Sequence, residues 1–142
     1  WVERDGLLDT LGDLGIGSIV FTPLAQGLLT SKYLTGMPEG SRAVQGKSLD
    51  PGKITDEMRA KLNRLNDIAA ARGQTLAQMA LAWALRDDKV TTALIGASKP
   101  EQVVDCAGAL GRLDFDASEL SEIDEIAQDA GLNLWARSSE EV

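Results

Sequence analysis

The sequence contains no histidine and a single cysteine, Cys106. Without histidine, Cys–His zinc sites, Ser–His–Asp triads and histidine acid–base catalysis are excluded within this chain. A single cysteine cannot close an intrachain disulfide, which fits a reducing compartment. The sequence also lacks an apolar run of about 20 residues and a basic segment followed by a short apolar one. We therefore expect a cytoplasmic protein with no membrane partner.

Positive charge is scarce as well. The chain has 14 Lys and Arg against 22 Asp and Glu, and its formal net charge of -8 argues against a nucleic-acid partner. An anionic ligand would have to be held by local donors and a few placed cations. At 142 residues, with 44% hydrophobic and 25% charged residues, the chain is long enough for one ordinary soluble domain.

Hydrophobic spacing predicts helices that alternate with two strands. A helix over residues 7–14 precedes a strand over 18–21, which we expect to be buried on both faces because it is a short apolar run. Trp83 is expected in the core. A loop is expected at 35–53, followed by helices that begin near Thr55 and at the capping pattern Thr75–Gln78. A strand is expected at 90–96, followed by helices after Pro100 and Asp116. The tail at 131–142, which contains Trp135, is expected to be irregular.

This order of elements implies parallel βα units. Two strands cannot make a stable sheet alone, whereas a complete (β/α)8 barrel needs about 250 residues. We therefore expect an α/β fold that is the C-terminal part of a (β/α)8 TIM barrel, comprising its last two strands with their helices. Residues 1–142 would be the C-terminal portion of a single barrel domain, with strands 1–6 missing.

The loop after the first expected strand is the first candidate site. Ligands gather at the carboxyl ends of strands in α/β proteins, and the segment from Pro23 to Gly27 can expose backbone N–H groups there. Leu24 could press on a flat ring or sugar, and Lys32 could face a phosphate. The alternative is an ordinary surface loop whose lysine is solvated.

A second candidate site lies in the segment 96–102, where the second strand passes directly into a helix. Unpaired N–H groups and the helix dipole favour an anion at such a point, and Ser98 and Lys99 add a hydroxyl and a charge. In the alternative interpretation, Ser98 simply caps the helix through its own side chain, as its spacing to Glu101 suggests. The sequence leaves both open.

Other polar residues carry less information. Arg42 could clamp a phosphate with two hydrogen bonds, although an isolated arginine in a polar loop is more often solvated. The carboxylate runs fit helix ends and solvated faces, and we assign no metal ligand.

The two motifs, Phe21–Tyr33 and Gly96–Gln102, together resemble the aldo-keto reductase superfamily. Within it they resemble the branch that contains bacterial L-glyceraldehyde 3-phosphate reductases and the potassium-channel β subunits. The closing segment 132–135 resembles the tail of the glyceraldehyde phosphate reductases. The resemblance covers essentially the whole chain and implies a (β/α)8 barrel that binds NADPH across its C-terminal face.

The resemblance also implies roles for individual residues. Phe21 and Thr22 would border the nicotinamide, and Ser98 and Lys99 would meet the 2′-phosphate, which favours NADPH over NADH. Pyrophosphate and sugar contacts would come from Pro23, Leu24, Ala25, Gly27 and Lys32, and contacts on the adenosine side from Arg42, Gly96, Gln102, Asp105 and Cys106.

Some positions depart from the family pattern. Cys106 stands where the family usually has an asparagine, and a thiol cannot make the bonds of an amide to adenine. Gly40 stands where relatives can carry an aromatic residue that covers the cofactor, and Thr22 replaces a serine. Family members reduce carbonyls with an Asp, Tyr, Lys and His set on earlier strands. None of those four positions lies in this chain, so no catalytic residue is assigned.

The resemblance implies NADPH-dependent reduction of aldehydes or ketones in the complete protein. The substrate would be a small carbonyl compound such as L-glyceraldehyde 3-phosphate or a methylglyoxal-like aldehyde, and a homo-oligomer is left open. Two alternatives remain: a non-catalytic NADP(H)-binding or regulatory module like the channel β subunits, and an inactive fragment.

Overall fold

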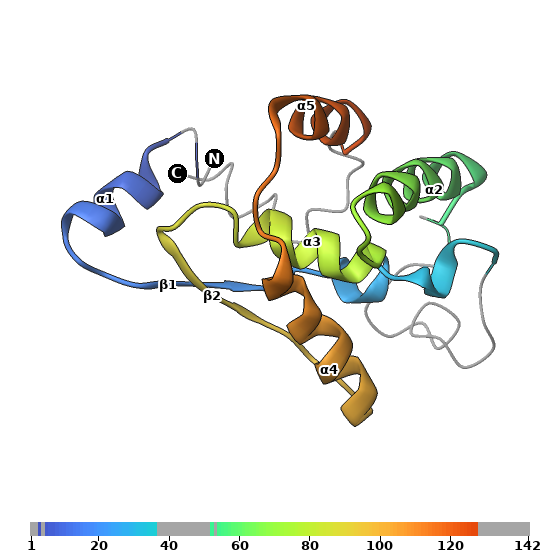
Figure 1. The fold of residues 1–142 in the computed structure, drawn as a ribbon, viewed down its shortest axis with the longest axis horizontal. Helices are drawn as coiled ribbons and strands as arrows, with labels where there is room; N and C mark the ends of the chain where they lie inside the picture. Colours follow the sequence, from blue (N-terminus) through green and yellow to red (C-terminus); the bar gives the residue numbers. More distant parts are fainter. Residues whose placement is uncertain (1–2, 4, 37–51, 53, 128–142) are drawn as a thin grey trace.

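The computed structural model describes residues 3, 5–36, 52 and 54–127 (Figure 1). The helices and strands follow the expected order. Their bounds are α1 Leu7–Asp13, β1 Ser18–Phe21, α2 Asp56–Ala71, α3 Leu76–Ala84, β2 Val90–Leu94, α4 Pro100–Ala107 and α5 Ala117–Ile126, with short 3-10 turns at Ala25–Gly27, Ser31–Tyr33 and Gly108–Gly111.

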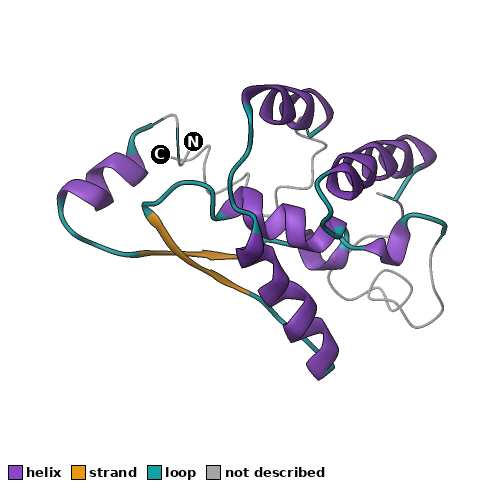
Figure 2. Cartoon of the chain, in the orientation of Figure 1, coloured by secondary structure: helices purple, strands orange, loops and turns teal. Residues whose placement is uncertain are grey.

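The two strands form a parallel pair, as the alternation of strands and helices predicts (Figure 2). Ile19 pairs with Thr92 and Phe21 with Leu94, and the register is irregular between Ser18 and Ile19. Because Phe21 and Leu94 are the last residues of their strands, the loops that follow begin side by side at one edge of the sheet. The second strand ends two residues earlier than expected.

The expectation that the first strand is buried on both faces is wrong. Ile19 is 67% exposed and Phe21 58% exposed, and their neighbour across the sheet, Leu94, is 63% exposed. Side chains alternate between the faces of a strand, and Val20 and Ala93 on the other face are half-buried. α3 contacts β2, so the described part of the chain covers one face of the sheet and leaves the other open.

The core lies among the helices rather than over the sheet. α3 contacts α2, α4 and β2, and thus occupies the centre of the structure (Figure 1). α2 carries an apolar face, which packs against α3 and α5. The members of this first cluster are Leu65, Ile68, Ala69, Leu76, Met79, Ile123 and Ile126.

A second cluster joins α2 to the loop after β1. Leu28, Tyr33, Ile54 and Leu62 are all buried there, and Tyr33 is only 1% exposed. Tyr33 is therefore a core residue. Trp83 packs against the first cluster as a partly buried side chain, with the Arg86 guanidinium 3.8 Å above its ring.

Helix starts follow the capping patterns. The Thr75 hydroxyl accepts the Gln78 N–H at 3.1 Å while the Gln78 amide oxygen accepts the Thr75 N–H at 3.0 Å, so the predicted reciprocal cap of α3 is confirmed. Asp116 and Glu119 form the same arrangement at α5. Among the described residues, no helix is long and apolar enough to cross a lipid bilayer.

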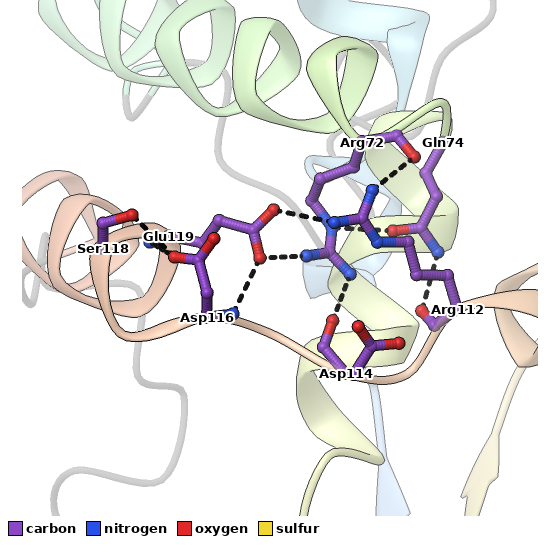
Figure 3. A network of polar contacts seen from close by, with 7 residues as sticks. All are labelled: Arg72, Gln74, Arg112, Asp114, Asp116, Ser118 and Glu119. Carbon is purple, nitrogen blue, oxygen red and sulfur yellow. Dashed lines mark hydrogen bonds and ion pairs between the residues drawn. The ribbon is translucent and has the colours of Figure 1, made fainter.

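A buried arginine ties the ends of three helices together (Figure 3). The side chain of Arg72, directly after α2, is 1% exposed and forms an ion pair with Glu119 on α5. Its guanidinium also donates to the Asp114 carbonyl at 2.8 Å and to the Gln74 amide oxygen at 2.9 Å. Arg112 approaches the same Glu119 carboxylate at 3.2 Å.

The Arg72–Glu119 pair allows a stability prediction. Glu119→Gln should lower the free energy of unfolding by about 3 kcal/mol, because it leaves the Arg72 charge buried without its counter-ion. Glu125→Gln on the same helix is the matched control, since Glu125 pairs with Arg64 at 3.8 Å on the exposed surface. That variant should change stability by less than about 0.5 kcal/mol. Urea unfolding measures both, and equal effects would contradict the assignment.

Candidate functional site

The candidate site lies where both strands end. The loop 22–30 follows β1 and the loop 95–99 follows β2, and the parallel register places their starting points next to each other. Phe21 and Thr22 are exposed at this edge, as are Gly96, Ser98 and Lys99. The structure thus brings the two predicted motifs to the same edge of the sheet.

The loop after β1 has an unusual backbone. Three non-glycine residues lie in the left-handed region, Thr22 at φ 57°, Ala25 at φ 45° and Gln26 at φ 61°, followed by Gly27 at φ 94°. A left-handed conformation costs a non-glycine residue about 1–2 kcal/mol. Leu28, which is 2% exposed, anchors the end of the loop in the core.

Hydrogen bonds within this loop use some of the donors that the sequence offered to a ligand. The Ala25 N–H donates to the Thr22 carbonyl at 3.0 Å, and the Gly27 N–H donates to the Leu24 carbonyl at 2.9 Å. Pro23 has no N–H. Of the segment 23–27, only the N–H groups of Leu24 and Gln26 remain as candidate ligand donors, which is fewer than the sequence suggested. Lys32 is exposed on the following turn.

The loop after β2 directs three donors at one oxygen. The amide oxygen Oε1 of Gln102 lies 2.8 Å from the Ser98 backbone nitrogen, 3.2 Å from the Ser98 hydroxyl and 3.2 Å from the Lys99 backbone nitrogen. Three donors that converge on one acceptor oxygen could equally bind a phosphate oxygen. The exposed Lys99 side chain adds a positive charge beside them.

The cap of α4 differs from the alternative drawn from the sequence. Lys99, not Ser98, is the N-cap residue, and the side chain that reaches back is Gln102 rather than Glu101. Lysine has no acceptor atom, so its own side chain cannot cap the helix. The Ser98 hydroxyl donates to Gln102 and leaves its own lone pairs available.

Asp105 and Cys106 lie further along α4. The Asp105 carboxylate accepts the Gln78 amide N–H at 2.9 Å, so α3 holds this side chain. Cys106 is half-buried, and burial together with the neighbouring Asp105 charge raises the pKa of its thiol. The sequence identified Gln78 only as a cap residue and gave no sign of its second partner.

Several predicted residues fall outside the described part of the chain. These are Gly40, Arg42 and the closing segment with Trp135. Among residues 3, 5–36, 52 and 54–127, no group of three or more His, Cys, Asp or Glu side chains could hold a metal ion.

An open groove of about 610 Å³ lies at the opposite edge of the sheet. Its walls combine apolar side chains such as Leu8 and Phe115 with two ion pairs, Arg86–Glu3 and Lys89–Asp9, both at 2.7 Å. The sequence did not predict this groove, which is built from segments distant in the chain.

Comparison with known proteins places these motifs in a family. Residues 1–128 match the Aldo/keto reductase family. The chain is 49% identical to the L-glyceraldehyde 3-phosphate reductases of Escherichia coli strains K12 and O157:H7, over 99% of its own length and 42% of theirs. It is 39% identical to a putative voltage-gated potassium channel subunit beta of Schizosaccharomyces pombe, over 95% of its length and 40% of that protein. The chain thus spans about two fifths of these relatives.

The raised pKa of Cys106 predicts slow alkylation. At pH 8 the native protein should react with iodoacetamide more slowly than the urea-unfolded chain, because less of its thiol is ionised and burial hinders access. As the pH rises toward the elevated pKa, the rate for the native protein should climb. The chain has one cysteine, so mass spectrometry reports this site alone. Equal rates for the native and unfolded chain at pH 8 would refute the prediction.

Proposed function

The chain belongs to the Aldo/keto reductase family, and on that premise we propose that it supplies much of the NADPH site of a carbonyl reductase. In this proposal residues 1–142 are the C-terminal portion of one (β/α)8 barrel domain, and β1 and β2 are its last two strands. The open sheet face of Ile19, Phe21 and Leu94 would then line the interior of the barrel.

The observation that carries this proposal is the convergence of donors after β2. The Ser98 backbone N–H, the Ser98 hydroxyl and the Lys99 backbone N–H all point at the Gln102 oxygen, within 3.2 Å. A 2′-phosphate oxygen could take the place of that oxygen, while the Lys99 ammonium neutralises its charge. Gly96 lies in the same loop. This geometry fits NADPH better than NADH, which lacks the phosphate.

The other end of the cofactor would lie along the loop after β1. The exposed Phe21 ring and Thr22 would border the nicotinamide, and the Lys32 ammonium would face the pyrophosphate. The pre-shaped turn of Pro23, Leu24, Ala25 and Gly27 would hold the pyrophosphate and sugar through the Leu24 and Gln26 N–H groups. Arg42 and Gln102 would lie on the adenosine side, with Asp105 and Cys106 nearby on α4.

The proposed reaction is the reduction of a small aldehyde or ketone, with L-glyceraldehyde 3-phosphate or a methylglyoxal-like aldehyde as the leading substrates. The name of the Escherichia coli relatives supports this choice. NADPH would supply the hydride. This chain would bind and orient the cofactor but contribute no catalytic residue, because the family's Asp, Tyr, Lys and His set has no counterpart here.

A second candidate function is a non-catalytic NADP(H)-binding or regulatory module. Its support is the 39% identity to the potassium channel subunit beta of Schizosaccharomyces pombe.

Cofactor binding and turnover separate the two functions. The intact protein that contains this chain is titrated with NADPH and NADH, and NADPH oxidation is then followed with L-glyceraldehyde 3-phosphate and methylglyoxal. Tight NADPH binding with turnover supports the reductase, and binding without turnover of any aldehyde supports the regulatory module. Absence of NADPH binding overturns both.

Lys99 should determine the preference for NADPH. Lys99→Ala should weaken NADPH binding about 10–100-fold and leave NADH binding nearly unchanged, because only NADPH carries the 2′-phosphate. Lys89→Ala is the matched control, since Lys89 precedes the same strand at the opposite edge and pairs with Asp9. Isothermal titration calorimetry measures the affinities. An equal loss of affinity for both cofactors would contradict the assignment of Lys99 to the 2′-phosphate.

A further inference from the structure

We propose that Gln78 is a positioning residue for the cofactor site, because it clamps α4 to α3 through Asp105 and so fixes where Ser98 and Lys99 stand. This inference rests on the proposed function. It assigns Asp105 primarily to the clamp rather than to direct contact with the cofactor.

The amide of Gln78 bridges two helices. Its oxygen accepts the Thr75 N–H at 3.0 Å and completes the cap of α3. Its nitrogen donates to two atoms of Asp105, the backbone carbonyl at 3.0 Å and the carboxylate Oδ1 at 2.9 Å. The Thr75 hydroxyl also lies 3.5 Å from both carboxylate oxygens. One side chain therefore uses its acceptor on α3 and its donor on α4.

The backbone of Gly108 lies close against this amide. A Cβ on Gly108, the residue directly after α4, would lie 2.5 Å from the Gln78 amide nitrogen and 3.3 Å from its Cδ. Gly108 has φ -59° and ψ -19°, a right-handed helical conformation that any residue can adopt. Glycine at this position is therefore explained by the closeness of the amide and not by the backbone conformation.

Within the described residues, this polar contact is a principal link between α4 and α3. No residue of α4 is fully buried, and Val103 and Val104 are 50% and 73% exposed. Within residues 54–127, the apolar side chains of α4 itself therefore contribute little to its packing on α3, and the nearest buried apolar side chain is Ala109, directly after the helix. α4 has eight residues and is about 12 Å long. Because hydrogen bonds join its successive turns, a tilt at Asp105 would displace its first turn, where Gln102 gathers the Ser98 and Lys99 donors.

The decisive variant separates the two tasks of Gln78. In Gln78→Glu, a carboxylate oxygen still accepts the Thr75 N–H and caps α3, but the donor is lost and a second negative charge faces Asp105. We expect NADPH affinity to fall roughly tenfold, as on loss of one well-placed hydrogen bond to the phosphate. NADH affinity should fall much less. The double variant Gln78→Glu with Asp105→Asn exchanges the amide and the carboxylate between the two helices. It restores a donor–acceptor pair and should recover most of the NADPH affinity.

Gly108→Ala tests the same clamp without removing a polar group, because the new methyl group displaces the Gln78 amide. Gly111→Ala is the matched control, since no atom lies within 4 Å of a Cβ at Gly111. Gly108→Ala should reproduce the selective loss of NADPH affinity, and Gly111→Ala should leave both affinities unchanged. Calorimetric titration of the intact protein with each cofactor gives these affinities, and circular dichroism gives helix content.

The outcomes distinguish this inference from the proposed function. If the unaltered protein binds no NADPH, the proposed function itself is wrong and the clamp has no cofactor to position. If it binds NADPH and the Gln78→Glu and Gly108→Ala variants bind it equally well, the clamp is refuted while the function stands. Equal losses for NADPH and NADH with reduced helix content would show a merely structural role. Failure of the exchange variant would assign Asp105 to the cofactor directly, which also overturns the inference.

Discussion

The Arg72–Glu119 ion pair determines how the helices of this chain are joined. Arg72 directly follows α2, its counter-ion lies on α5, and its other hydrogen bonds reach Gln74, just before α3, and Asp114, just before α5. The guanidinium also stacks 3.7 Å above the Phe115 ring. Because the Arg72 side chain is only 1% exposed, its charge depends on this counter-ion. In the helical core, α2 packs against α3 and α5, and α3 in turn contacts α4 and β2.

The local features of the fold could be predicted from the sequence. The side chains of Thr55, Thr75 and Asp116 accept free backbone N–H groups and so mark the starts of three helices. The strand at 18–21 ends where the Thr22–Pro23 step prevents its continuation. The two candidate loops were also predicted, because ligands collect where parallel strands end. Such features depend on neighbours within a few residues.

Features that depend on distant segments could not be predicted. In the sequence, Arg72 looks like an ordinary residue at a helix end. Its ion pair is visible only in the structure, because Glu119 lies 47 residues later in the chain. Gln78 reads as a cap until Asp105 is placed beside it. The exposure of Ile19 and Phe21 was not predicted for a related reason. An apolar run indicates that a strand face is buried in the folded protein, but not which segment covers it.

The left-handed run at Thr22, Ala25 and Gln26 has a consequence for how a ligand would be received. The loop takes its bent form from its own turns and from Leu28 in the core. The free-energy cost of the left-handed residues therefore arises when the chain folds, and it does not reduce the affinity for a ligand. A flexible glycine-rich loop would fold more easily and would then have to be ordered by every ligand. Here the loop after β1 already has its shape, so a ligand that binds along it would not have to order it.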